Sequence, residues 1–287
     1  MCMTLQPSRM SGTILYGAET LHNDQLLHVM GYQNRAENLG SGPNAMLLPI
    51  PSALPMGPEN AIDLRACKNV LRDYEKTWVT MNTSRSRSMS KSFGDHDALS
   101  TKVQVFDSGS YTVVLASDPK YIDSALSQVP ADRRPNPNPA IFEAYGKLYP
   151  GWHIAMCCYN AKVDAEPMLW QYQPLDPSHI WLPALDGHDG RAPNLTAHVQ
   201  RDHTVIVSLV NSPRSKFSTR LATKQDIHTL SGDPIPDNLQ YLFGKHFFGT
   251  QTHGTTKNGD FMIPVAKLAG QGEVNPHDFQ VSLPPGA

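Results

Sequence analysis

The densest group of side chains that could do chemistry lies within residues 182–190 and at residues 202–203. Carboxylates and imidazoles gather there around two glycines, and Zn, Mn and Fe accept both ligand types in proteins. A metal bound there could polarise water for hydrolysis, with one unbound carboxylate acting as general base. The candidate metal ligands are Asp186, His188, Asp189, Asp202 and His203.

The same residues are also typical of turns. Asp-Gly is an ordinary turn pair, Asp side chains cap their own turns, and Gly187 and Gly190 permit a sharp bend. The spacing matches no established metal-ligand motif. Two interpretations therefore stay open, a metal-dependent hydrolase or a tight exit from a core strand, and a site exists only if the two segments are neighbours.

Two further polar segments could bind a small ligand. Arg35 and Glu37 lie in a polar stretch bounded by apolar, strand-like runs. Lys245 and His246 lie in a glycine-rich stretch, residues 244–259, whose backbone amides could hold an anion. We expect loops at both places, and solvated surface loops have the same composition.

No sequence motif identifies an enzyme. Neither a phosphate-binding glycine loop nor a serine-hydrolase elbow nor a zinc-protease helix occurs. No CxxC zinc spacing is present, and Cys157 and Cys158 lie in an apolar run that is typical of buried structural cysteine. We expect no cofactor, apart from a divalent metal if the cluster around His188 binds one, and leave enzymatic activity open.

The charge and hydropathy of the chain restrict its partners. A net charge of −2 provides no overall field that would hold a nucleic acid. No run approaches the ~20 apolar residues that span a bilayer, and the first ten residues lack the apolar core of a secretory signal. We therefore expect a cytoplasmic protein with free thiols, no membrane contact, and a protein partner or a small polar ligand.

Hydrophobic periodicity and turn residues predict mostly strands. A hairpin is expected at residues 13–32, and Asp118 and Pro119 are expected to start a helix. Helices are also predicted over residues 61–79 and 139–149, and an amphipathic helix could form over 216–229. The remaining predicted strands are residues 45–50, 103–106, 111–116, 152–159, 168–173, 180–182, 204–210 and 261–265.

The predicted domain organisation is one globular domain, residues 1–268, followed by a poorly ordered or surface-draped tail, 269–287. A Ser- and Arg-rich mobile loop is expected at residues 82–100. Residues 28–49 and 153–170 share a pattern in which an apolar strand ends near Tyr-Asn or Gln-Asn and a Met-Leu strand follows. An internal duplication would give two similar β-units, 12–80 and 101–210.

The sequence as a whole predicts an α+β fold. We expect a mainly antiparallel, sandwich-like β core with two to four short helices and long Pro- and Gly-rich connections, because the chain has 24 Pro and 20 Gly and few charged residues. The function it favours is a β-rich binding or assembly protein. Metal-dependent hydrolysis at the cluster around His188 is the alternative.

Overall fold

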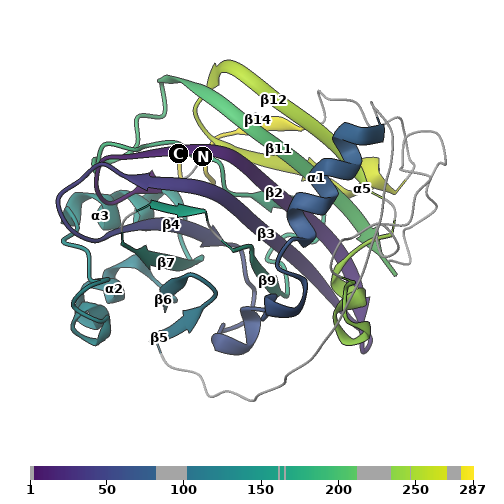
Figure 1. The fold of residues 1–287 in the computed structure, drawn as a ribbon, viewed down its shortest axis with the longest axis horizontal. Helices are drawn as coiled ribbons and strands as arrows, with labels where there is room; N and C mark the ends of the chain where they lie inside the picture. The colour runs from purple at the N-terminus through teal and green to yellow at the C-terminus, as the bar shows by residue number, and fades with distance from the viewer. Residues whose placement is uncertain are drawn as a thin grey trace.

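A computed structural model describes residues 3–81, 102–160, 162–164, 166–211, 234–245, 247–269 and 279–287. Within these ranges the strands form three sheets, and short helices cover their outer faces (Figure 1). The predicted α+β, sandwich-like fold is confirmed. The predicted loop 82–100 and the predicted helix 216–229 lie outside the described residues.

The largest sheet is built on a long hairpin. Strands β2 and β3 pair antiparallel, and Asn23 and Asp24 join them with φ of 48° and 60°. Asn and Asp tolerate this left-handed backbone, so the predicted hairpin turn is confirmed. The order of the six-stranded sheet is β12 (Phe248–Lys257), β11 (His198–Val210), β2 (Ser8–His22), β3 (Gln25–Asn38) and β8 (Lys162–Asp164), and β9 (Met168–Tyr172) also pairs with β3.

The five-stranded sheet is antiparallel throughout. Its order is β1 (Met3–Thr4), β4 (Asn44–Ile50), β7 (His153–Tyr159), β6 (Tyr111–Ala116) and β5 (Val103–Ser108). Within this sheet, strand β1 pairs with Leu47 and Met46 of β4. Pro49 lies beyond this pairing, where its missing N–H breaks no bond to β1.

The smallest sheet uses the end of the chain. Its order is β10 (His179–Leu182), β13 (Asp260–Pro264) and β14 (Gln280–Ser282). Strand β14 pairs with β13, Phe279 is buried beside it, and the amide of Gly286 donates to the carbonyl of Leu148. The described end of the predicted tail is thus fixed by pairing and by burial.

The main hydrophobic core lies between the sheets. It joins side chains such as Leu15 and Tyr32 of the large sheet, Met46 and Ala155 of the five-stranded sheet, and Ile263 of the small sheet. A second cluster fills the outer face of the five-stranded sheet beneath α2 (Ile122–Ala125) and α3 (Pro139–Leu148), and a third lies beneath α1 (Val70–Met81). Helices therefore cover both outer faces of the sandwich (Figure 1).

Helix α1 begins nine residues later than the sequence indicated. The amide of Ile62 donates to the carbonyl of Leu169, and Ala61 forms an isolated bridge with Trp170. This segment is therefore held against strand β9, and only short 3-10 turns, η1 (Pro58–Asn60) and η2 (Arg65–Cys67), precede α1. Tertiary pairing overrides the apolar helical spacing there.

The two helical segments over the five-stranded sheet confirm the sequence-based prediction. The Asp118 side chain accepts a bond from the amide of Lys120 at the start of the 3-10 helix η3 (Pro119–Tyr121), which leads into α2 and η4 (Leu126–Gln128). The Asn138 side chain likewise caps α3 by accepting from the amide of Ala140. Both segments carry Pro in the first turn, where its fixed φ suits a helix.

Two expectations about the second half of the chain are wrong. Residues 244–259 were expected to form a loop, but strand β12 pairs with β11 from Phe248 to Lys257, in keeping with its many β-branched threonines. Asp202 and His203 were expected to open a strand, but they lie inside β11. The 3-10 helix η5 (Asp237–Leu242) and the short α5 (Val265–Leu268) complete the described elements.

The two segments with similar sequence patterns pair crosswise. Strand β3 pairs with β9, and β4 pairs with β7, so each segment contributes one strand to the large sheet and one to the five-stranded sheet. An exchange of this kind is what two related β-units would make. Duplication stays a prediction.

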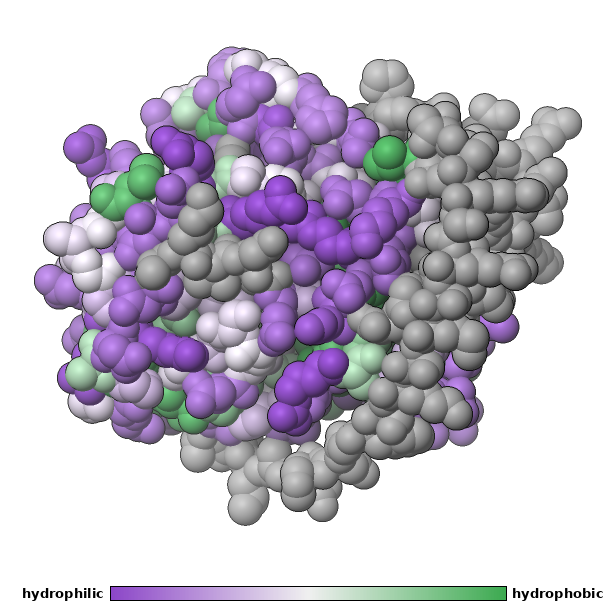
Figure 2. Space-filling view, viewed as in Figure 1, coloured by the Kyte–Doolittle hydropathy of each residue, from purple (hydrophilic) through white to green (hydrophobic). Residues whose placement is uncertain are grey.

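The exposed face in Figure 2 is mostly hydrophilic, with small, separate hydrophobic spots. Over the described ranges, none of the helices has the length and apolar character needed to cross a membrane.

Candidate functional site

The segment after β10 is a firmly held turn. The amides of Ala184 and Leu185 donate to Asp260 Oδ1 at 2.7 and 2.8 Å, and the amide of Asp186 donates to Asn258 Oδ1 at 2.8 Å. On its other side, the carbonyl of Gly187 accepts from the amide of Thr4. Residues 184–187 therefore take their shape from β13 and from the N-terminal strand.

The five candidate metal ligands do not come together. His188 Nε2 lies 3.2 Å from Asp186 Oδ1, and both side chains are largely buried. Asp189 is exposed and accepts the amide of Arg191, which makes it the cap of its own turn. No group of three or more His, Cys, Asp or Glu within the described ranges is arranged to hold a metal ion.

Strand geometry explains why Asp202 and His203 separate. Neighbouring residues of a strand point to opposite faces. Asp202 faces outward, where it accepts the amide of Gly12 and lies 3.3 Å from His253. His203 faces inward, 1% exposed, with its ring edge-on to Phe261. The two segments are linked instead by Arg201, whose guanidinium donates to the carbonyl of Ala184 at 3.1 Å.

A buried charged network that the sequence analysis missed organises this region. Arg201 is 1% exposed and also donates to the carbonyl of Gly259 at 2.8 Å and to Thr256 Oγ1 at 2.6 Å. Asp260 is fully buried and accepts from four donors, the amides of residues 184 and 185, the Tyr149 hydroxyl and the Trp181 indole. Burial raises the pKa of Asp260, and these bonds oppose the shift. The network ties three elements together and is closed to solvent.

The four candidate ligand-binding residues are dispersed. The loop expected at Arg35 and Glu37 is wrong: both lie on β3, paired with β2 and β8. Glu37 forms a 2.9 Å ion pair with Arg9. Lys245 is exposed and follows Gly244, whose carbonyl accepts from the Tyr74 hydroxyl beneath α1. His246 lies outside the described residues.

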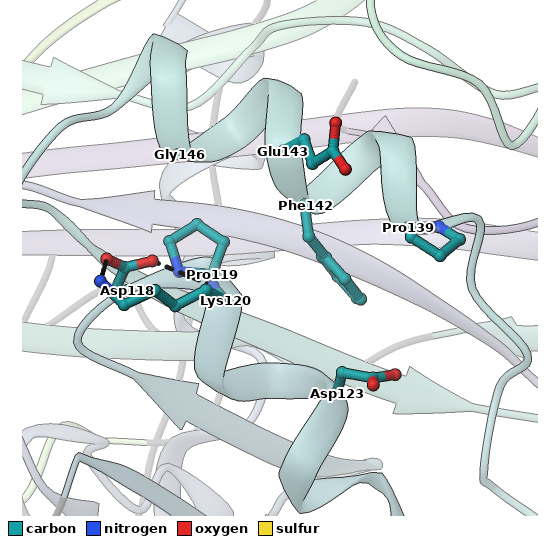
Figure 3. A pocket seen from close by; sticks show the side chains of 8 residues that line it. All are labelled: Asp118, Pro119, Lys120, Asp123, Pro139, Phe142, Glu143 and Gly146. Carbon is teal, nitrogen blue, oxygen red and sulfur yellow. Dashed lines mark hydrogen bonds and ion pairs between the residues drawn. The ribbon is translucent and has the colours of Figure 1, made fainter.

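A different region forms a groove, between the η3–α2 segment and α3 (Figure 3). Its volume is about 280 Å³. Phe142 points from α3 toward the opposite segment, and the prolines of both first turns complete an apolar floor. The lining residues are Asp118, Pro119, Lys120, Asp123, Pro139, Phe142, Glu143 and Gly146.

The helical period places these residues. Ile141, Tyr145 and Leu148 of α3 pack on the five-stranded sheet. Phe142 and Gly146 are four residues apart, so they lie one above the other on the adjacent side of the helix. Ile122 and Ala125 anchor α2 to the same sheet face. The groove therefore exists because two capped helical segments bury their apolar sides against one sheet.

Gly146 keeps the groove open. It lies inside α3, where a glycine is less favourable than alanine by about 0.5–1 kcal/mol. A β-carbon built on Gly146 would meet no atom within 4 Å. Packing among the described residues does not require glycine at this position, where the absence of a side chain leaves space in the groove.

The rim of the groove is acidic. Lys120 is paired with Asp118, so this pair adds no net charge. Asp123 and Glu143 are exposed, and among the described side chains neither has an ion pair or a hydrogen bond. The groove thus combines an apolar floor with two unneutralised carboxylates, one on each side.

Comparison with known proteins adds one structural likeness. No protein-family model and no curated protein matches the chain. Among solved structures, the crystal structure of baculovirus P35 is similar, with 14% sequence identity over 93% of this chain and 92% of that chain and a TM-score of 0.44.

Proposed function

We propose that this protein binds another polypeptide and that the groove between η3–α2 and α3 receives part of the partner. The observation that carries the proposal is Gly146, a groove-lining glycine inside a helix at which an added β-carbon would meet no described atom within 4 Å. Glycine in a helix interior costs stability relative to alanine, and no contact among the described residues requires it at this position.

The size of the groove supports a polypeptide over an enclosed small molecule. Sites for drug-sized ligands occupy about 300–1,000 Å³ and bury most of the ligand. A groove of about 280 Å³ that is open along its rim suits one anchoring side chain with its backbone outside. Metal-dependent hydrolysis lacks comparable support, because the candidate ligands do not converge in the part of the chain that the structure describes.

The proposal is tested with a phage-displayed library of random 12-residue peptides selected on the immobilised protein. Gly146→Trp places a large side chain in the groove, and Lys147→Trp places the same side chain on an exposed position of α3 outside it. We expect selected peptides to bind the unmodified protein and Lys147→Trp but to lose at least tenfold in affinity for Gly146→Trp. Failure to select peptides, or equal binding to all three proteins, would refute the proposal.

A further inference from the structure

We propose that the occupant of the groove is a basic segment, in which an apolar anchor side chain is flanked by Lys or Arg. This inference rests on the proposed function and adds the chemistry of the partner. It follows from three features of the groove: the floor, the rim and the helix starts.

The floor sets the anchor. The apolar lining consists of Phe142, Pro119 and Pro139. Pro139 is exposed, whereas Pro119 is buried and Phe142 is 7% exposed, so these two present only a small carbon surface. Apolar surface that leaves water on binding contributes about 25 cal/mol per Å², so an aliphatic or aromatic side chain is favoured over a polar one.

The rim sets the charge beside the anchor. Asp123 lies on the η3–α2 side of the groove and Glu143 on the α3 side (Figure 3). Both negative charges favour a cation beside the anchor. The only cation in the lining, Lys120, is already engaged by Asp118 and lies over the Tyr121 ring, 5.0 Å from its centroid. Complementary charge speeds association and excludes acidic segments by repulsion.

The starts of both helical segments argue against an acidic occupant as well. Free amides at a helix start attract anions. Here the amide of Lys120 is bonded to the Asp118 side chain, and the amide of Ala140 is bonded to the Asn138 side chain. Pro119 and Pro139 have no amide hydrogen to offer. The helix starts therefore do not offset the acidic rim.

The experiment measures the groove-dependent peptides from the selection above as fluorescein-labelled synthetic peptides. We expect a consensus with Lys or Arg within about two positions of the apolar residue. An exposed ion pair changes affinity about 1.5- to fivefold. The double variant Asp123→Asn/Glu143→Gln removes two such pairs and should therefore bind about two- to twenty-five-fold more weakly. Its binding should also lose most of its salt dependence between 50 and 500 mM NaCl.

The matched control is Asp24→Asn/Asp189→Asn, which makes the same change in net charge at two turns that do not line the groove and should bind as the unmodified protein does. Asp123→Lys/Glu143→Lys should select acidic peptides from the same library. Peptides that Gly146→Trp blocks but that lack basic residues, or bind the neutralised variant unchanged, would overturn this inference and leave the proposed function standing. If no selected peptide is sensitive to Gly146→Trp, the proposed function fails, and this inference falls with it.

Discussion

Removal of the Asp260 carboxylate is the sharpest test of how the turn after β10 is held. Oδ1 accepts the amides of Ala184 and Leu185, and Oδ2 accepts the Tyr149 hydroxyl at 2.6 Å and the Trp181 indole at 3.3 Å. Asp260→Ala leaves all four buried donors without this acceptor. Asp260→Asn keeps one oxygen and replaces the other with an NH₂ group.

The two substitutions should differ in cost. An unsatisfied buried polar group costs about 1–3 kcal/mol, so four of them predict a loss of at least about 4 kcal/mol for Asp260→Ala. In Asp260→Asn, the amide oxygen still accepts the two backbone amides and the NH₂ can donate to the Tyr149 hydroxyl. The Trp181 N–H then faces the NH₂ group, which is also a donor, and the negative charge that compensates Arg201 is lost. The expected cost is about 1–3 kcal/mol.

Urea unfolding, followed by tryptophan fluorescence and circular dichroism, measures both free energies of unfolding. Asp189→Ala removes an exposed carboxylate and should cost less than about 0.5 kcal/mol. Equal losses for Asp260→Ala and Asp260→Asn would show that charge, not hydrogen bonding, is decisive, and a loss below about 2 kcal/mol for Asp260→Ala would refute the reasoning altogether. If Asp260→Ala does not fold, Tyr149→Phe replaces it, with an expected cost of about 1.5–3 kcal/mol for one bond to a carboxylate.

Three further predictions concern other parts of the molecule. Gly146→Ala should raise the free energy of unfolding by about 0.5–1 kcal/mol, because the added β-carbon meets no neighbour and alanine favours the helix. A lower free energy of unfolding in urea would contradict the open space at Gly146. Burial lowers the pKa of His153, so the folded protein favours the neutral ring, and the free energy of unfolding should fall as the pH drops below about 6.5. This fall should be less steep in His153→Gln. If the free energy of unfolding falls equally steeply in both proteins between pH 7 and 5, His153 does not cause the pH dependence. Burial raises the pKa of Cys158 to about 12, and Cys67 and Cys157 are buried as well. In a Cys2→Ala variant, a thiol reagent at pH 8 should therefore label these three cysteines only after the protein unfolds. Rapid labelling of the native protein would show that they are accessible.

Local patterns in the sequence predicted the elements well where the relevant physics is local. The hairpin turn at Asn23-Asp24 and the helix start at Asp118 depend on residues within a few positions, and both were placed correctly, as was the helix after Asn138. Helix α1 was overextended because the apolar spacing of residues 61–69 does not report their pairing with β9. A chain segment that bonds to a distant strand cannot be recognised from its own composition.

The buried network could have been found from one signal. Arg201, His203, Val205 and Val207 alternate in β11, so Arg201 lies on the same face as the buried valines. A charged residue on an apolar face indicates a buried partner. That partner, Asp260, comes from a strand 59 residues away, so its identity needed the three-dimensional fold.

The turn after β10 and the groove differ in how their polar groups are satisfied, and this difference decides which of them is the better candidate for binding. At the turn, Asp260, Asn258 and Arg201 supply hydrogen-bond partners from within the chain, so the shape of the turn follows from folding alone. At the groove, folding explains neither the helical glycine nor the two carboxylates that the described part of the chain leaves unneutralised. A helical glycine costs stability and no contact among the described residues requires it, which is why we propose the groove, and not the turn, as the binding site.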